Sequence, residues 1–221
     1  MPAPIKTIYE DDIVQVFDKP SGMLVTPSPK MKQPTLTDVV NKGISSDEDF
    51  RLHPCHRLDK ETSGLIIYAK GKKNQQLMMR MFQEKKIKKT YLAIVRGKLK
   101  RDQGTITQPV LSINERQEKP AVTTYRVLRK HKNFSFLELR PLTGRQHQIR
   151  IHLKAIGHPV LGEEVYAFRK DFTIRFRRLA LHAQKLEWRN PVTRSTVKVA
   201  SVLPDDMKNF LNQYGISLSL I

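Results

Sequence analysis

The segment from His56 to Leu65, HRLDKETSGL, holds the densest group of side chains in this sequence that could do chemistry. A histidine, an arginine, two acids and two hydroxyls stand in ten residues, and an apolar run follows directly. Asp59 is the candidate for chemistry, because a carboxylate can act as a nucleophile, a general base or a metal ligand. Residue types alone leave another interpretation open, since many loop aspartates only form local hydrogen bonds.

Residues 140–159, RPLTGRQHQIRIHLKAIGHP, form a second polar segment. Ile149, Leu153 and Ile156 repeat at helical spacing. This spacing predicts a helix that ends at Gly157 and the proline beyond it.

Three basic side chains, Arg145, His147 and Arg150, stand in the first turns of that expected helix. Positive charge there opposes the helix dipole and favours a bound anion. A buried aspartate that acts as a nucleophile must stay ionised, and a nearby arginine favours the ionised form. Arg150 is therefore the candidate partner of Asp59.

Several other kinds of site find little support in the sequence. His53, Cys55 and His56 stand together in HPCH, but no second cysteine pair and no His-Glu-x-x-His pattern accompanies them, so no metal site is predicted. His147 and His152 lie on different faces of a helix. The glycine-rich phosphate loops and the Gly-x-Ser-x-Gly elbow are absent, which disfavours nucleotide hydrolysis and serine hydrolase chemistry.

The charge of the chain points to a polyanionic partner. Its 221 residues include 40 Lys and Arg but only 21 Asp and Glu, a formal net charge of +19. Such an excess destabilises the compact state unless a polyanion or salt neutralises it, which favours nucleic acid. The alternative is a basic protein whose charges are evenly solvated.

Length and cysteine content indicate one domain in a reducing compartment. A chain of this length can bury one sizeable core, and its single cysteine, Cys55, cannot form an internal disulfide. No apolar run has the length of a signal peptide core or a membrane span. We expect a cytoplasmic protein that does not enter membranes, and we expect a monomer.

The elements that must position these residues are mostly strands. Residues 13–17 alternate, and Met23 to Val25 are expected to continue them as a hairpin after the turn Lys19-Pro20-Ser21-Gly22. Further expected strands are residues 65–69, the segment beginning near Tyr91, and residues 104–110, 121–129, 134–140, 179–188 and 196–200. Expected helices are residues 36–43, 72–82, 145–156 and 205–211. Residues 44–54 are expected to form a loop. Hairpin connections dominate, so we predict an α+β domain with a mixed, mainly antiparallel sheet.

Several long motifs, taken together, resemble the RluA-type pseudouridine synthases. HRLDKETSGL is similar to the catalytic motif of this family, KKTYLAIVRG to its second motif, and RPLTGRQHQIRIHLKAIGHPVLG to its third. DKPSGMLV and LALHA match its early hairpin and a later strand, in the same order along the chain. The resemblance implies the catalytic-domain fold of this family and isomerisation of uridine to pseudouridine in RNA, without metal or cofactor.

The resemblance also implies roles for particular residues. Asp59 corresponds to the catalytic carboxylate, which attacks ribose C1′ or assists a glycal intermediate, and Tyr91 to the tyrosine that stacks on the target base. As a strand aromatic, Tyr91 could equally be core. Arg150 corresponds to the basic partner of the carboxylate, and Arg57 to the arginine that fills the space of the flipped-out nucleotide. The residues expected to support the pocket or contact phosphate are His56, Thr62, Arg145 and His147, although purely structural hydrogen bonds would also explain them.

Two basic clusters stand outside the catalytic Asp59 motif and the third motif, Lys85 to Lys89 and Arg169 to Arg178. Either would suit an RNA backbone, although a charge run is often only a solvated face. The motifs begin within about a dozen residues of Met1. We therefore expect residues 1–221 to be one catalytic domain without a separate N-terminal RNA-binding domain.

The expected substrate is structured tRNA or ribosomal RNA, recognised partly by its shape. Two other functions stay open at this point. One is an RNA-binding module or chaperone without turnover. The other is a hydrolase of the glycosidic bond, which ordinarily needs a second carboxylate, and Glu61 is the candidate nearest in sequence.

Overall fold

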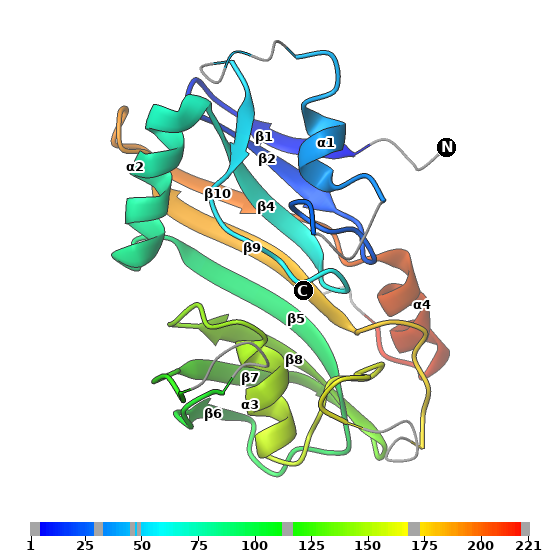
Figure 1. Cartoon of the computed structure of the whole chain (residues 1–221). Helices are drawn as coiled ribbons and strands as arrows, with labels where there is room; N and C mark the ends of the chain where they lie inside the picture. The colour runs from blue at the N-terminus through cyan, green and yellow to red at the C-terminus, as the bar shows by residue number, and fades with distance from the viewer. Residues whose placement is uncertain are drawn as a thin grey trace. The chain divides into compact units, whose positions relative to one another are not determined.

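The computed structural model describes residues 5–28, 33–44, 47, 50–111, 117–167 and 173–217. These residues form ten strands and four helices (Figure 1). The chain divides into two compact units, the first comprising Met1–Lys88 and Ala183–Ser201 and the second Lys89–His182 and Val202–Ile221. That residues 1–221 act as one catalytic domain stays a prediction. None of the helices in the described ranges combines the length and apolar content needed to span a membrane.

The first unit is built on strands in the order β1-β2-β4-β9. Strand β10 pairs with β9, and β3 pairs with β4. The strands are β1 (Lys6–Glu10), β2 (Val14–Lys19), β3 (Leu52–Pro54), β4 (Ser63–Lys70), β9 (Leu181–Arg189) and β10 (Thr196–Ala200), and the helices are α1 (Leu36–Val40) and α2 (Gly71–Gln83).

Strand β4 is the most deeply buried element of this unit. All of its residues except Lys70 are buried, as expected for an apolar run with neighbours on both edges. Helix α2, expected over residues 72–82, follows β4 directly and buries Met78 and Met81 in the core. Because β4 begins four residues after Asp59, the segment HRLDKETSG leads straight into this strand.

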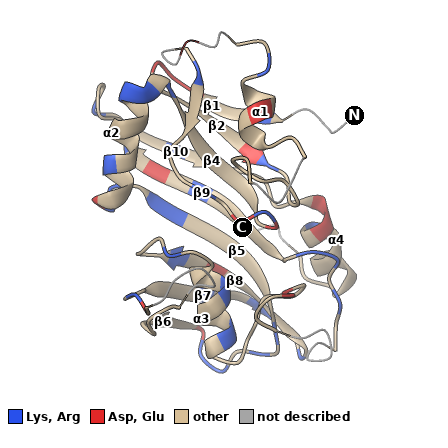
Figure 2. Ribbon diagram, viewed as in Figure 1, with Lys and Arg blue, Asp and Glu red and all other residues tan. Residues whose placement is uncertain are grey.

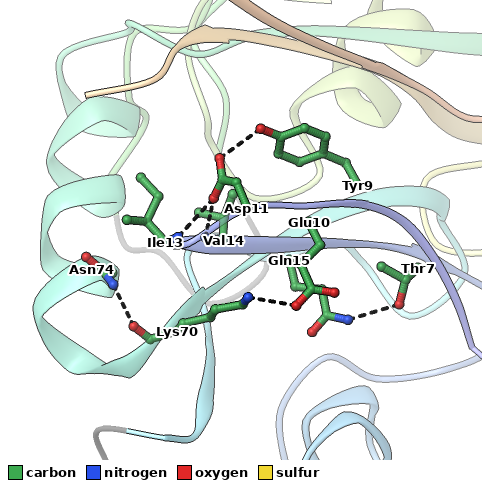
Figure 3. Close-up of polar contacts among 9 residues, drawn as sticks. All are labelled: Thr7, Tyr9, Glu10, Asp11, Ile13, Val14, Gln15, Lys70 and Asn74. Carbon is green, nitrogen blue, oxygen red and sulfur yellow. Dashed lines mark hydrogen bonds and ion pairs between the residues drawn. The ribbon is translucent and has the colours of Figure 1, made fainter. Parts of the chain in front are cut away.

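The turn between β1 and β2 is fixed by one carboxylate. Asp11 accepts the backbone N–H groups of Ile13 and Val14 and the Tyr9 hydroxyl, at 2.8 to 2.9 Å (Figure 3). At the other end of β4, Lys70 pairs with Glu10 at 2.7 Å, which ties β1 to the start of α2. These local bonds set the register of β1, a strand that the sequence pattern did not predict.

The predicted hairpin through Met23–Val25 is wrong. Strand β2 pairs instead with β1 and β4, and residues 23–25 form no strand. The carbonyls of Leu24 and Val25 accept the N–H groups of Leu36 and Thr37 at 2.8 and 3.1 Å. They thereby satisfy the first N–H groups of α1, which have no partner inside the helix. The expected loop over residues 44–54 also contains the short strand β3.

The second unit contains strands in the order β5-β8-β7-β6, and its β5–β8, β8–β7 and β7–β6 pairs are antiparallel. The strands are β5 (Lys88–Arg96), β6 (Gln103–Ile106), β7 (Thr123–Lys130) and β8 (Phe134–Pro141), and the helices are α3 (Gln148–Ala155) and α4 (Asp205–Gln213). The α+β class with a mainly antiparallel sheet is therefore confirmed.

Helix α3 is shorter at its start than the sequence predicted. Its N-cap residue is His147, in the left-handed region with φ 54°, so Arg145 precedes the helix. The Gln148 side chain accepts the N–H of Arg145 at 3.1 Å and the hydroxyl of Thr143 at 2.7 Å. Gln148 also donates to the carbonyl of Val122 at 2.9 Å, which fixes the entry to α3 against the segment before β7.

Candidate active site

Asp59 lies in the loop between β3 and β4, in the first unit, and is half-buried. Its carbonyl accepts the N–H of Thr62 at 3.1 Å, which closes a turn over residues 59–62. Thr62 is buried, and within the described ranges its hydroxyl oxygen has no hydrogen-bond partner. The turn fixes the backbone at Asp59, a half-buried residue that is not part of the apolar core.

Residues of the turn 19–23 donate hydrogen bonds to the backbone carbonyls of this loop. The carbonyl of Lys60 accepts the Gly22 N–H at 2.8 Å and the Lys19 ammonium at 3.0 Å. The carbonyl of Glu61 accepts the Ser21 hydroxyl at 2.7 Å. The residues just after Asp59 are therefore fixed through their backbone, independently of their side chains.

Lys19 is fully buried, with 0% of its surface exposed. Its ammonium also donates to the carbonyls of Pro20 and Met23, at 2.9 and 2.8 Å. With Lys60, three carbonyls thus accept from a group that has three N–H donors. Lys19, the lysine of the Lys-Pro-x-Gly segment, therefore has a structural role and connects this segment to the Asp59 loop.

His56 and Arg57 begin the loop. The imidazole of His56 packs against the ring of Phe82 at 4.5 Å between centroids, and its Nε2 atom accepts a backbone N–H of β4. Arg57 is exposed. Burial raises the pKa of the nearby Cys55 to about 12, so this residue is a neutral buried thiol. Across the described ranges no group of three or more His, Cys, Asp or Glu side chains could hold a metal ion.

Tyr91 lies on β5 in the second unit, opposite Leu139 of β8. It is partly buried and packs against the apolar core of this unit. Lys89 stands two residues earlier and so points to the same face of the strand. Burial lowers the pKa of the Lys89 ammonium.

Arg150 lies in α3 and forms a buried pair with Glu163. The Nε and Nη2 atoms donate to the two oxygens of Glu163 at 2.7 and 2.6 Å. The side chains are only 6% and 0% exposed. The guanidinium also lies over the ring of Tyr166, 5.4 Å from its centroid.

His147 and Arg145 lie at the start of α3. The Nδ1 atom of His147 and the Tyr166 hydroxyl form a hydrogen bond of 2.8 Å. Arg145 is exposed, and its Nε atom donates to the carbonyl of Pro120 at 3.2 Å. Thus the second unit brings His147, Arg150, Glu163 and Tyr166 together.

Each unit therefore gathers its own part of the predicted set. His56, Arg57, Asp59 and Thr62 share one loop of the first unit. Glu163 and Tyr166, which stand in the run VLGEEVY after α3, are not among the residues that the sequence predicted. An acid beside Val160 and Leu161, both buried, was the available signal, because an ionised side chain in such surroundings requires a partner.

The two basic clusters differ in how their charges are paired. In the first cluster Lys86 pairs with Glu84 at 2.6 Å and Lys88 with Glu187 at 2.9 Å, and Figure 2 shows further Lys and Arg along the adjacent α2. In the second cluster residues 169–172 lie outside the described ranges.

The described part of the second cluster alternates between half-buried apolar residues and arginines. Ile174 and Phe176 are half-buried, whereas Arg175 and Arg177 are exposed. Both arginines line a cavity of about 370 Å³ together with Gly162 and Glu163. Arg178 ends the segment in a two-bond pair with Asp206 of α4, at 2.6 and 2.7 Å.

Comparison with known proteins gives a consistent match. A family model described as RNA pseudouridylate synthase matches residues 13–155. The dual-specificity RNA pseudouridine synthase RluA of Pasteurella multocida is 39% identical over 197 residues, covering 85% of this chain and 88% of the relative. Ribosomal large subunit pseudouridine synthase D of Nitrosomonas europaea is 37% identical over 224 residues, covering 94% of this chain and 64% of the relative.

A solved structure matches the fold over nearly the whole chain. Human RNA pseudouridylate synthase domain containing 4 aligns with a TM-score of 0.81 and 25% identity, covering 96% of this chain and 94% of that one.

Proposed function

The chain belongs to the RNA pseudouridylate synthase family, and from this premise we propose that it isomerises specific uridines of structured tRNA or ribosomal RNA, with Asp59 as the catalytic carboxylate. The observation that carries the proposal is that the matched residues, 13–155, contain Asp59, Tyr91 and Arg150 in their motifs. As a member of this family, the protein is an enzyme that converts uridine to pseudouridine in RNA.

The reaction breaks the bond from ribose C1′ to N1 of uracil and forms a new bond from C1′ to C5. Asp59 acts at the sugar, either by attack on C1′ or by assisting a glycal intermediate, while the detached uracil turns over. The C5 proton then leaves and N1 gains a proton, so the product is an isomer of the substrate. A carboxylate in this role must keep its direction through both steps, and the backbone bonds at Lys60 and Glu61 support that requirement.

Tyr91 and Arg150 take supporting roles in the same proposal. Tyr91 stacks on the target base and helps to remove the C5 proton, which its partly buried place on β5 favours. Arg150 pairs with Asp59 and keeps the carboxylate ionised. Two bonds to Glu163 hold the Arg150 guanidinium in a fixed direction, which supports this role.

The target uridine has to leave its stack before Asp59 can reach C1′. Arg57 is exposed beside Asp59, which supports its assignment to the space that the flipped-out nucleotide leaves. Thr62 supports the pocket with a buried hydroxyl that lacks a partner within the described ranges. His56, Arg145 and His147 orient the loop and α3 or contact phosphate.

Exposed arginines are the proposed contacts to the RNA backbone. Arg175 and Arg177 face the cavity beside Glu163, and phosphate oxygens are the usual acceptors for such side chains. The relatives point to the substrate class, since one is named a dual-specificity RNA enzyme and another a ribosomal large subunit enzyme. We place the protein in the cytoplasm as a monomer that needs no metal or cofactor.

The test is tritium release from RNA labelled at uridine C5, with bulk unmodified tRNA and fragments of ribosomal RNA as substrates. We expect release by the wild type and none by Asp59→Asn, which should still bind RNA. An active Asn variant contradicts the role of Asp59. Binding without release by the wild type would indicate an RNA-binding module, and free uracil in place of pseudouridine would indicate a hydrolase.

A further inference from the structure

Glu163 is a buried acid to which the proposed mechanism gives no role. Its two oxygens accept from four donors in total. Two are the Nε and Nη2 atoms of Arg150 at 2.7 and 2.6 Å, and two are the backbone N–H groups of Val165 and Tyr166 at 2.8 and 3.2 Å. A carboxylate with this many donors has one possible orientation.

The two bonds between Glu163 and Arg150 fix the plane of the guanidinium as well as its distance from the carboxylate. Two parallel N–H···O bonds between a guanidinium and a carboxylate hold both groups coplanar. Burial opposes ionisation of Glu163, but the hydrogen bonds and charge of Arg150 and the two backbone N–H groups outweigh it and lower the pKa of Glu163. The pair is therefore charged on both sides.

The backbone bonds of Glu163 shape the turn that carries Tyr166. From this turn the Tyr166 hydroxyl reaches Nδ1 of His147 at 2.8 Å, while its ring lies 5.4 Å below the Arg150 guanidinium. His147 has a left-handed backbone with φ 54°, so its ring direction is not set by regular helix geometry. One carboxylate thus orients Arg150 directly and His147 through Tyr166.

We propose that Glu163 is a positioning residue for the isomerisation, holding the Arg150 guanidinium and the His147 imidazole in their working directions. The inference rests on the proposed function, in which Arg150 acts on Asp59. The bonds to Glu163 hold the Arg150 guanidinium in one direction and partly neutralise its charge within the second unit.

Glu163→Gln tests the inference with little change in shape. The amide oxygen can still accept from Val165 and Tyr166, whereas the amide NH₂ meets the Nε–H of Arg150, donor against donor. We expect kcat to fall at least tenfold while KM for RNA changes less than twofold, since Glu163 is buried. Asp205→Asn is the control for loss of an acid, because Asp205 is exposed on α4 of the same unit and does not line the cavity with Arg175 and Arg177, and it should match the wild type.

The pH dependence of kcat distinguishes a positioning role from a purely structural one, because a purely structural role of Glu163 would not change the pH profile. In Glu163→Gln the full charge of Arg150 acts on its surroundings, so we expect the acidic limb of the profile to shift to lower pH. Glu163→Asp keeps the charge and should restore the position of that limb. An acidic limb unchanged in Glu163→Gln overturns the inference.

A double-variant cycle tests whether Glu163 acts through Arg150. In an Arg150→Lys background, which has no planar guanidinium to hold, Glu163→Gln should cost less than a further twofold in kcat. Equal losses in both backgrounds overturn the inference. The proposed function fails separately, if the wild type releases no tritium at all.

If Glu163→Gln does not fold at the assay temperature, Tyr166→Phe takes its place. This variant removes only the hydroxyl that contacts His147 and keeps the ring below Arg150. We expect kcat to fall about threefold with KM unchanged. A rise in KM alone, or wild-type kcat, contradicts the proposal.

Discussion

His56 accepts the backbone N–H of Ile67 at its Nε2 atom, over 3.0 Å. An imidazolium ion has no free lone pair and cannot accept, so this bond requires a neutral ring with its proton on Nδ1. The bond ties the first residue of the Asp59 loop to the middle of β4. His56 is thus a link between the reactive loop and the most buried strand of its unit.

The His56 bond predicts different effects for two substitutions. His56→Ala leaves the Ile67 N–H without a side-chain acceptor and should lower the free energy of unfolding by about 1–3 kcal/mol. His56→Gln offers an amide oxygen and should recover part of this loss. Urea unfolding followed by circular dichroism measures both. Equal stabilities of the two variants would contradict the importance of the acceptor.

Lys19→Met should destabilise the protein more than an ordinary surface substitution. The change removes a buried ammonium that donates to three backbone carbonyls, and we expect a loss of about 3 kcal/mol in the free energy of unfolding, together with lower kcat. Lys73→Met on the exposed face of α2 is the matched control and should lie within about 0.5 kcal/mol of the wild type. Similar values for both variants would argue against a structural ammonium.

Gly162→Ala and Gly157→Ala separate backbone strain from steric conflict. Both glycines have positive φ, 75° and 84°. A Cβ at Gly162 would collide with the carbonyl oxygen of Arg178, whereas one at Gly157 meets no atom within 4 Å. We expect losses in the free energy of unfolding of about 1 kcal/mol for Gly157→Ala, from strain alone, and clearly more for Gly162→Ala. Equal losses for the two variants in urea titrations would mean that backbone strain, and not the collision with Arg178, determines the loss of stability.

The stability of the second unit should fall as the pH is lowered from about 6.5 toward 4. Burial, and then the charge of Arg178, lower the pKa of His182 from 6.5 to about 4, with Asp206 acting in the opposite direction. Because the unfolded chain binds the proton more readily, acid favours unfolding across this range, by on the order of 3 kcal/mol. Thermal unfolding at several pH values measures the slope, which His182→Gln should flatten. If stability depends on pH as steeply in His182→Gln as in the wild type, then other groups cause the pH dependence.

The Arg175 and Arg177 pair should contribute to the salt dependence of RNA binding. Replacing both with Gln should reduce the slope of log affinity against log salt by about 0.7–0.9 for each phosphate that the variant no longer neutralises. KM for RNA should rise while kcat at saturating RNA stays the same. Lys208→Gln on α4 is an exposed control for the removal of one charge. An unchanged salt slope in the double variant would mean that Arg175 and Arg177 do not contact phosphate, and the cluster from Lys85 to Lys89 would be the next to test.

Local patterns were sufficient to predict most elements of the fold. The apolar run at Leu65 predicted β4 because a strand buried on both faces needs no alternation, and the helix expected over residues 72–82 is α2. In the second unit, the strands expected over residues 104–110, 121–129 and 134–140 overlap β6, β7 and β8. These signals lie within single helices and strands, where residues that are close in sequence are also close in space.

Elements and contacts that depend on distant partners were missed. Strand β1 is a short polar segment that becomes a strand only by pairing with β2. The carbonyls of Leu24 and Val25 are used by helix α1, which no periodicity in residues 23–25 reveals. Among the site residues, Glu163 finds Arg150 across a turn thirteen positions away. Motif similarity indicated Arg150, but not the acid that holds it.

The burial of β4 determines how the protein can lose activity. Its interior amides, from Leu65 to Ala69, lie among neighbours on both edges, so they should exchange with solvent deuterium only through opening of the whole first unit. The Asp59 loop is attached to this strand and to the Lys19 ammonium, so we expect it to unfold together with the strand. Heat inactivation and loss of structure should coincide in a single transition, and substitutions deep in β4 should reduce activity in cells by lowering the amount of folded enzyme rather than its turnover.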